Sequence, residues 1–297
     1  MTAPTPLWHL GEEVYAKLEY LHPSGSIKHR SIPVHIEALV RTGELVAGQT
    51  IVIRSAGSAA VAAAWAGARL GHPVIAVLPP TVAPNIVRLL RWFGAQCNVL
   101  PPADASQLVD DLRSRDGGYV LEQANEARLI DHYRPVGAEI LAELAATAIT
   151  VGIGTGLSIT GIAREVRERN PACRVYGVEP AEAPVASGGS WAPHGIPGLA
   201  PPIMQPLLDH SLLSGIVTVA SSQARQHARD TARHSGLPLG PSSGATVAAA
   251  SILREQGVTG PIVAVCACSI NDYLEDAGHM TASAPADSPR VTSSLPT

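Results

Sequence analysis

Short apolar runs alternate with longer amphipathic stretches along most of the chain. The runs are rich in Val and Ile rather than strictly alternating, which is typical of strands buried on both faces of a sheet. The longer stretches carry apolar residues at helical spacing. The alternation predicts an α/β fold with mostly parallel sheets wrapped by helices. The predicted strands are 51–54, 74–78, 97–100, 119–122, 149–152, 174–179, 216–219 and 262–268, and the predicted helices are 33–41, 58–70, 83–93, 106–114, 136–146, 159–168, 222–235 and 244–256.

Three connecting segments and the tail stand out from this pattern. Two glycine-bearing turns, 54–58 and 152–158, each leave a predicted strand and enter a predicted helix. Ligands of α/β sheets bind at the carboxyl ends of strands, so both turns are candidate site loops. Segment 182–205 is rich in Pro, Gly and Ser without a period, which predicts a functional loop or lid. Residues 282–297 are rich in Ser, Thr, Pro and Ala and predict a disordered tail.

Composition and charge exclude some classes of function. Charged residues make up 15% of the 297 residues, against about a quarter in an average globular protein. Mean hydropathy is +0.16, so we expect surface buried between subunits, in a homodimer. The net charge of −4 and the absence of a Lys/Arg-rich run argue against nucleic-acid binding. No uninterrupted apolar stretch reaches the roughly 18 residues of a membrane span, and the first residues lack a signal-peptide pattern, so we expect a cytoplasmic protein.

The cysteines and histidines do not predict a metal site. Four cysteines are too few for a disulfide framework in a chain of this length. Cys266 and Cys268 alternate along a predicted buried strand and are expected to be small buried side chains. The eleven histidines are scattered and show no zinc-binding spacing. We therefore expect no metal.

Only two of the 21 basic residues, Lys17 and Lys28, are lysines. Chemistry that needs a primary amine therefore has two candidates, because arginine stays protonated. Lys28 follows Ser-Gly-Ser at a turn that feeds a helix. A helix N-terminus disfavours the charged ammonium, and imine formation needs the neutral amine. The alternative for Lys28 is an ordinary surface lysine at a helix start.

The segment 152–161 alternates glycine with other residues before a predicted helix. Such a turn directs backbone N–H groups toward one point, and Thr155 and Ser158 add hydroxyls. The following helix contributes its positive N-terminal end, so the segment predicts a phosphate site. It matches neither the dinucleotide pattern G-x-G-x-x-G nor a Walker loop. The pattern therefore favours a small phosphorylated cofactor, with an ordinary tight turn as the alternative.

Taken in this order, the residues resemble the cysteine synthase family of fold-type II pyridoxal-phosphate (PLP) enzymes. The resemblance runs from about residue 5 to residue 273 and includes further matches at 177–180, 187–189, 193–198 and 242–245. It implies that Lys28 forms the Schiff base with PLP. It also implies that Gly154, Thr155, Gly156, Leu157 and Ser158 bind the cofactor phosphate, and that the hydroxyl of Ser269 contacts the pyridine nitrogen.

The chain also departs from the family pattern. Where the family reads Thr-Ser-Gly-Asn-Thr-Gly, this chain has Ser55, Ala56, Gly57, Ser58, Ala59 and Ala60. The resemblance implies that Ser55, Ala56, Gly57 and Ala59 bind the substrate carboxylate and that Ser58 replaces the asparagine facing the cofactor. Gly198 and Gln123 complete the implied substrate site, with Glu122 as the alternative to Gln123. Leu157 replaces a phosphate-loop glycine, and His29 replaces an aspartate.

The resemblance implies two domains of the tryptophan synthase β-like type. A smaller mobile domain spans 32–129, and residues 1–31 plus 130–281 form the larger domain that anchors PLP. The implied reaction is β-replacement on an O-activated L-serine through an aminoacrylate, followed by addition of a small nucleophile. Lys28 serves as the general base, and the altered loop favours a specialised amino-acid synthase. The alternatives are a β-eliminating lyase of the serine/cysteine deaminase or desulfhydrase type, or a catalytically silent PLP-binding relative.

Overall fold

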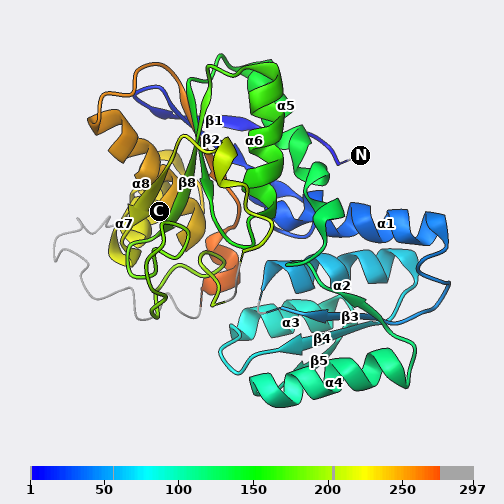
Figure 1. The fold of residues 1–297 in the computed structure, drawn as a ribbon. Coiled ribbons are helices and arrows are strands. Elements are labelled where there is room, and N and C mark those ends of the chain that lie inside the picture. Colours follow the sequence, from blue (N-terminus) through cyan, green and yellow to red (C-terminus); the bar gives the residue numbers. More distant parts are fainter. Residues whose placement is uncertain (1, 56, 203–204, 275–297) are drawn as a thin grey trace, which may run out of the picture.

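The computed structural model describes residues 2–55, 57–202 and 205–274. It contains two sheets that lie beside each other, each flanked by helices (Figure 1). The six-stranded sheet has the order β1-β2-β10-β7-β8-β9, in which only the β1–β2 pair is antiparallel. Its strands are β1 (Leu7–Gly11), β2 (Val14–Leu18), β7 (Ala148–Gly152), β8 (Arg174–Pro180), β9 (Gly215–Val219) and β10 (Ile262–Cys266).

The four-stranded sheet is entirely parallel and has the order β5-β4-β3-β6. Its central strands are apolar and buried, as the sequence pattern predicts. The strands are β3 (Ile51–Arg54), β4 (Val74–Leu78), β5 (Gln96–Val99) and β6 (Tyr119–Leu121).

Helices cover both faces of each sheet (Figure 1). In the small sheet, α2 (Ser58–Leu70) packs on β3 and β4 from one side and α4 (Pro102–Ser114) from the other. The alanine-rich sequence of α2 lets it approach the sheet closely, and most of its residues are buried. The remaining helices of this half are α1 (Ile32–Thr42) and α3 (Pro84–Trp92).

In the large sheet, α8 (Pro241–Glu255) lies against the central strands, with α7 (Ser221–Ser235) outside it. On the opposite face α6 (Leu157–Arg169) contacts β7 and β8, and α5 (Arg134–Glu143) packs on α6. Short 3-10 helices connect these elements. They are η1 (Glu19–Leu21), η2 (Ile27–Arg30), η3 (Ala127–Leu129), η4 (Asp131–Tyr133), η5 (His210–Leu212) and η6 (Ile270–Tyr273).

The predicted α/β class with mostly parallel sheets is confirmed, and each of the eight predicted strands overlaps an observed one. The predicted strands include neither β1 nor β2. β1 is an edge strand whose Trp8 is 47% exposed, and its residues do not form a buried apolar run. Between β8 and η5, the described part of segment 182–205 contains no helix or strand. The predicted tail, 282–297, lies outside the described residues.

The strands of the small sheet all fall between residues 51 and 121, and those of the large sheet fall on either side of that range. The domain boundaries at 32 and 129 and the mobility of the smaller domain remain predictions. No helix in the described part of the chain is long and apolar enough to cross a membrane.

Candidate active site

A pocket lies at the carboxyl ends of β7 and β10 and reaches the N-terminus of α2 from the small sheet. It contains about 620 Å³ of atom-free space, part of it open to solvent. Six residues that the sequence singled out line it together, although they come from four separate segments. These residues are Lys28, Ser58, Gly154, Thr155, Ser158 and Gly198.

Lys28 lies on η2 and reaches the pocket from a well-anchored backbone. Its N–H donates to Ser26 Oγ at 3.3 Å, and its carbonyl accepts from the Ser31 N–H at 3.2 Å. Among the described residues no carboxylate lies within ion-pair range of its Nζ. Burial lowers the pKa of the Lys28 ammonium to about 8. A neutral amine is therefore accessible near physiological pH, as attack on a carbonyl requires.

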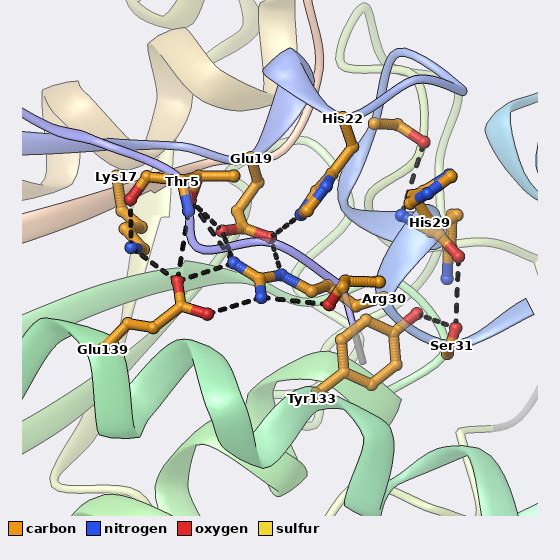
Figure 2. A network of polar contacts seen from close by, with 12 residues as sticks. Thr5, Lys17, Glu19, His22, His29, Arg30, Ser31, Tyr133 and Glu139 are labelled. Atoms are coloured by element: carbon orange, nitrogen blue, oxygen red, sulfur yellow. Dashed lines mark hydrogen bonds and ion pairs between the residues drawn. The ribbon is translucent and has the colours of Figure 1, made fainter. Parts of the chain in front are cut away.

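Lys17, the other lysine, has quite different surroundings. It is fully buried on β2, and its Nζ lies 2.7 Å from Glu139 Oε2 and also donates to the carbonyl of Thr5 (Figure 2). Lys17 does not line the pocket, and its amine is held by these two partners. The geometry therefore favours Lys28 as the reactive amine.

The same buried network fixes the segment that carries Lys28. Arg30, the last residue of η2, forms two hydrogen bonds of 2.8 Å with Glu19 and contacts Glu139 at 2.6 and 2.7 Å (Figure 2). Burial alone would raise the pKa of the Glu19 carboxyl, but hydrogen bonds from Arg30 and His22 outweigh it and lower this pKa to about 2. The network thereby ties η2 to β2, η1 and α5.

The phosphate site predicted at 152–158 is a turn at the N-terminus of α6. Gly156 precedes the helix with φ +87°, and a Cβ there would lie 2.7 Å from the Leu208 nitrogen. A Cβ on Gly154 would lie 2.6 Å from the Gly198 carbonyl oxygen. Only glycine fits either position. The first backbone N–H groups of α6 have no partner within the helix and can bind a phosphate.

Two residues of the predicted phosphate loop do not line the pocket. The Gly156 backbone shapes the turn, while Leu157 is 1% exposed and packs in the main hydrophobic core. Leucine in place of the family's glycine therefore fills the core and leaves the pocket unchanged.

Ser269, the predicted partner of the pyridine nitrogen, does not line the pocket either. Its hydroxyl donates to the Pro238 carbonyl at 2.9 Å. Ser242, at the start of α8, lines the pocket instead, as does Cys268. Ser242 belongs to the segment 242–245, which matches the family pattern but has no predicted role. The signal that could have found it is a serine in the first turn of a helix directly after a glycine-proline turn.

The predicted substrate loop leads from β3 into α2. Ser58, its last residue before the buried part of α2, lines the pocket, and Ser55 Oγ accepts from the Gly57 N–H at 3.4 Å. Ala59 is 2% exposed and its methyl group belongs to the hydrophobic core, so only its backbone could contact a ligand. Neither Ser55 nor Gly57 lines the pocket, and Ala56 lies outside the described residues.

The structure distinguishes Glu122 from Gln123. The Glu122 carboxylate forms an ion pair with Arg113 at the surface. Gln123 Oε1 is buried and has no hydrogen-bond partner among the described residues. Since Ile53 pairs with Leu121 across β3 and β6, Gln123 lies at the same sheet edge as Ser55. An unpartnered buried amide oxygen at this edge favours Gln123 as the residue facing a ligand.

Two mostly parallel sheets, a lysine without a carboxylate partner among the described residues and a glycine turn at a helix N-terminus are the features of a fold-type II pyridoxal-phosphate enzyme. The described residues fit this cofactor because they offer it an amine of lowered pKa and a phosphate site that only glycines can form. The family described as "Pyridoxal-phosphate dependent enzyme" matches residues 2–268. The chain belongs to this family, in its cysteine synthase-like branch, and is a PLP-dependent enzyme.

Two characterised relatives support the branch. Cysteine synthase 3 of Caenorhabditis elegans is 33% identical over 253 residues, which cover 81% of this chain and 74% of the relative. O-ureido-L-serine synthase of Streptomyces lavendulae is 32% identical over 259 residues, covering 84% and 80%. A crystal structure of O-ureido-L-serine synthase superimposes with a TM-score of 0.88 at 28% identity, covering 96% of this chain and 94% of that one.

A third relative is named for a different activity. A hydrogen sulfide-producing enzyme from Fusobacterium nucleatum superimposes with a TM-score of 0.83 at 25% identity, covering 91% of this chain and 96% of that one. The fold is therefore shared by enzymes described as synthases and by one described through the sulfide that it releases.

Proposed function

We propose that the protein catalyses β-replacement on an O-activated L-serine, with PLP attached to Lys28. The observation that carries the proposal is the pocket, which brings a partner-free amine of lowered pKa together with a phosphate site at the N-terminus of α6. The two characterised relatives, a cysteine synthase and an O-ureido-L-serine synthase, support this class of reaction.

The cofactor supplies the electron-withdrawing ring that acidifies the substrate Cα–H and lets the β-substituent leave. Lys28 Nζ lies in the same pocket and moves the Cα proton as a general base, because burial keeps a neutral fraction of this amine near pH 7. The first turn of α6, with Thr155 and Ser158, binds the phosphate. Ser58 lines the same pocket from the small-sheet half and would contact the cofactor there, and Gly198 lies beside the phosphate turn.

Two further assignments concern the cofactor ring and the substrate carboxylate. Ser242, rather than Ser269, provides the hydroxyl for the pyridine nitrogen, because only Ser242 lines the pocket. A hydroxyl does not keep that nitrogen protonated, which favours loss of a β-substituent over chemistry needing a stronger electron sink. Gln123 and the backbone of Ser55, Gly57 and Ala59 bind the substrate carboxylate.

The deciding experiment incubates the holoenzyme with O-acetyl-L-serine together with a nucleophile. Sulfide and hydroxyurea are tested as the nucleophile in separate reactions. We expect consumption of O-acetyl-L-serine and a new β-substituted alanine, identified by mass spectrometry. The same mixture with Lys28→Ala is the matched control and should give no product. Absence of any β-substituted product with serine, O-acetyl-L-serine and O-phospho-L-serine would contradict the proposal.

The second candidate is a β-eliminating lyase, which the sulfide-producing relative favours. A lyase should release pyruvate and sulfide from L-cysteine without an added nucleophile. A β-replacement enzyme should instead need the nucleophile for turnover. Measuring pyruvate with and without nucleophile separates the two.

We also propose a homodimer, located in the cytoplasm. Exposed apolar side chains support the dimer, and Trp92 at 85% and Val46 at 59% are the most exposed of the large ones that the structure describes. Size-exclusion chromatography with light scattering should give about twice the 30.8 kDa mass of the chain. A monomer at micromolar concentration would contradict the dimer.

Finally, we propose that the segment 32–129 moves as a smaller domain against residues 1–31 plus 130–281. Both halves contribute to the pocket, since Ser58 belongs to the first and Lys28 to the second. A change in their separation would therefore open or close the site.

A further inference from the structure

One wall of the pocket contains a thiol in direct contact with a hydroxyl. Cys268 Sγ lies 2.9 Å from Ser242 Oγ, and both residues line the pocket. Cys268 follows β10 and is 4% exposed, while Ser242 lies in the first turn of α8 and is 6% exposed. A sulfur and an oxygen at this distance are hydrogen-bonded, and either atom is able to donate.

The backbone holds the thiol in place. Cys268 N–H donates to Ser243 Oγ at 3.0 Å, and the Ser243 hydroxyl donates to the Cys268 carbonyl at 2.7 Å. The Gly240 N–H donates to the same carbonyl at 3.0 Å, and a Cβ on Gly240 would lie 2.5 Å from the Cys268 sulfur. Both polar backbone groups of Cys268 are therefore fixed by the turn that begins α8.

The protons of the Cys268–Ser242 pair determine which atom donates in this contact. The pair has two protons, one on sulfur and one on oxygen, and a single internal hydrogen bond uses one of them. Sulfur is a weak acceptor and a weak donor, whereas a hydroxyl is good at both. The favourable arrangement is S–H donating to Ser242 Oγ, which leaves the stronger O–H donor for a nitrogen lone pair. Burial raises the pKa of the Cys268 thiol, so the sulfur keeps its proton at neutral pH.

We propose that Cys268 is a positioning residue, whose thiol donates to Ser242 Oγ and directs the serine hydroxyl proton toward the pyridine nitrogen of the cofactor. The proposal rests on the assignment of Ser242 to that nitrogen. It explains why a buried thiol lies in a pocket where no step of the proposed reaction uses a cysteine side chain.

The chain supplies a matched control. Cys266 is two residues earlier and fully buried, and its sulfur contacts the Ala264 carbonyl and the Thr246 side chain but not Ser242. Replacing Cys266 by alanine removes the same atoms from the same strand end without touching Ser242.

The test compares wild type, Cys268→Ala, Cys268→Ser, Cys266→Ala and Ser242→Ala as holoenzymes. The readouts are the absorbance maximum and fluorescence of the bound cofactor, and the dissociation constant for PLP. Cys268→Ala should shift the band in the same direction as Ser242→Ala and weaken PLP binding by about threefold to tenfold, the effect of one neutral hydrogen bond. Cys268→Ser should restore both values because its hydroxyl can also donate, and Cys266→Ala should resemble wild type.

Each of the other outcomes contradicts one part of the proposal. If Ser242→Ala shifts the band and Cys268→Ala does not, the role of Cys268 is wrong while Ser242 stands. If neither shifts it, both assignments are wrong. If Cys268→Ser behaves like Cys268→Ala, the thiol does not act as a donor. Should Cys268→Ala fail to fold, Cys268→Val at similar volume takes its place, and a wild-type spectrum for Cys268→Val overturns the proposal.

Discussion

The two lysines show how surroundings decide the chemistry of a side chain. Lys17 is enclosed by Glu139, Glu143 and the Thr5 carbonyl, whereas Lys28 has no such partner among the described residues and lines the pocket. The difference follows from position, since Lys17 lies on β2 between the paired strands β1 and β10, and Lys28 lies on the short helix η2.

Replacing each lysine should therefore have opposite consequences. Lys28→Ala should abolish covalent attachment of PLP, seen as loss of a borohydride-reducible adduct by mass spectrometry, with little change in stability. Lys17→Met should keep the adduct but lose about 1.5–3 kcal/mol of unfolding free energy, the value of a hydrogen bond to a charged group. An adduct that persists in Lys28→Ala would show that Lys28 is not the attachment site.

The lowered pKa of Lys28 predicts how PLP attachment depends on pH. The pKa falls from 10.5 to about 8 on burial, so the neutral fraction at pH 7 rises from well under 1% to about a tenth. In the apoprotein the rate of PLP attachment should increase steeply from pH 6 toward pH 8 and level off above that pH. Stopped-flow absorbance at constant ionic strength measures it. A rate that keeps rising toward pH 10 would mean that the pKa is not lowered.

At this scale the sequence singled out the lysine and the glycine turn that line the pocket, but it did not show which serine hydroxyl faces it. Ser269 and Ser242 both follow turns, and the direction of a hydroxyl is set by its rotamer and by distant carbonyls such as that of Pro238. The choice between Glu122 and Gln123 likewise needed the position of Arg113. Such long-range contacts leave no local pattern in a sequence.

At the scale of elements, the position of η2 depends on the ion pair between Arg30 and Glu19. Glu19 has a pKa of about 2 against a usual value of 4.5, so folding favours its ionised form. The resulting stability is complete above pH 4.5 and is lost as the pH falls toward 2, about 3 kcal/mol in all.

Glu19→Gln should therefore unfold more easily at pH 7 by about 3–5 kcal/mol, because the buried Arg30 loses a carboxylate partner. It should also show a flatter dependence of stability on pH between 2 and 4.5 than wild type. Denaturant melts at several pH values, followed by circular dichroism, test both. Parallel pH dependences of the two proteins would contradict the role of Glu19.

The turn before α6 depends on backbone geometry. Gly156→Ala places a Cβ against the Leu208 backbone at a φ of +87°, so the turn must shift and PLP affinity should fall at least tenfold. Gly236→Ala is the matched control, since Gly236 also has a positive φ, +69°, but a Cβ there meets no atom within 4 Å. The control should lose about 1 kcal/mol of stability and keep its PLP affinity. Equal PLP binding in the two variants would show that the turn tolerates a side chain.

For the whole molecule, the sequence pattern predicted the fold well because both sheets have buried parallel strands that alternate with helices. Buried strands such as β3 and β10 are continuous apolar runs. The pattern failed at β1, where an antiparallel edge strand carries exposed side chains. It also could not place the two sheets relative to each other, because the pocket between them combines residues more than 200 positions apart, such as Lys28 and Ser242.

This arrangement makes one prediction about dynamics. A substrate that contacts both halves should slow amide hydrogen exchange simultaneously in the turn that begins α2 and in the turn that begins α6. PLP alone should slow exchange chiefly in the turn that begins α6. Hydrogen-exchange mass spectrometry of the apoprotein, the holoenzyme and the holoenzyme with O-acetyl-L-serine would measure this. Protection of only one turn by substrate would mean that the two halves do not close on it together.

The rarity of lysine also affects how the whole surface reacts. The exposed cationic side chains, such as Arg69, Arg115 and Arg233, are guanidinium groups, and neither lysine is exposed. Reducing sugars, aldehyde fixatives and activated-ester dyes, which modify surface amines of most proteins, therefore find no lysine on the outside of this one. Apart from the α-amine, the first amine that they meet is that of Lys28 at the bottom of its pocket. An activated-ester dye should consequently label the apoprotein at Lys28 and spare the holoenzyme, and its fluorescence would report how much of a preparation lacks its cofactor.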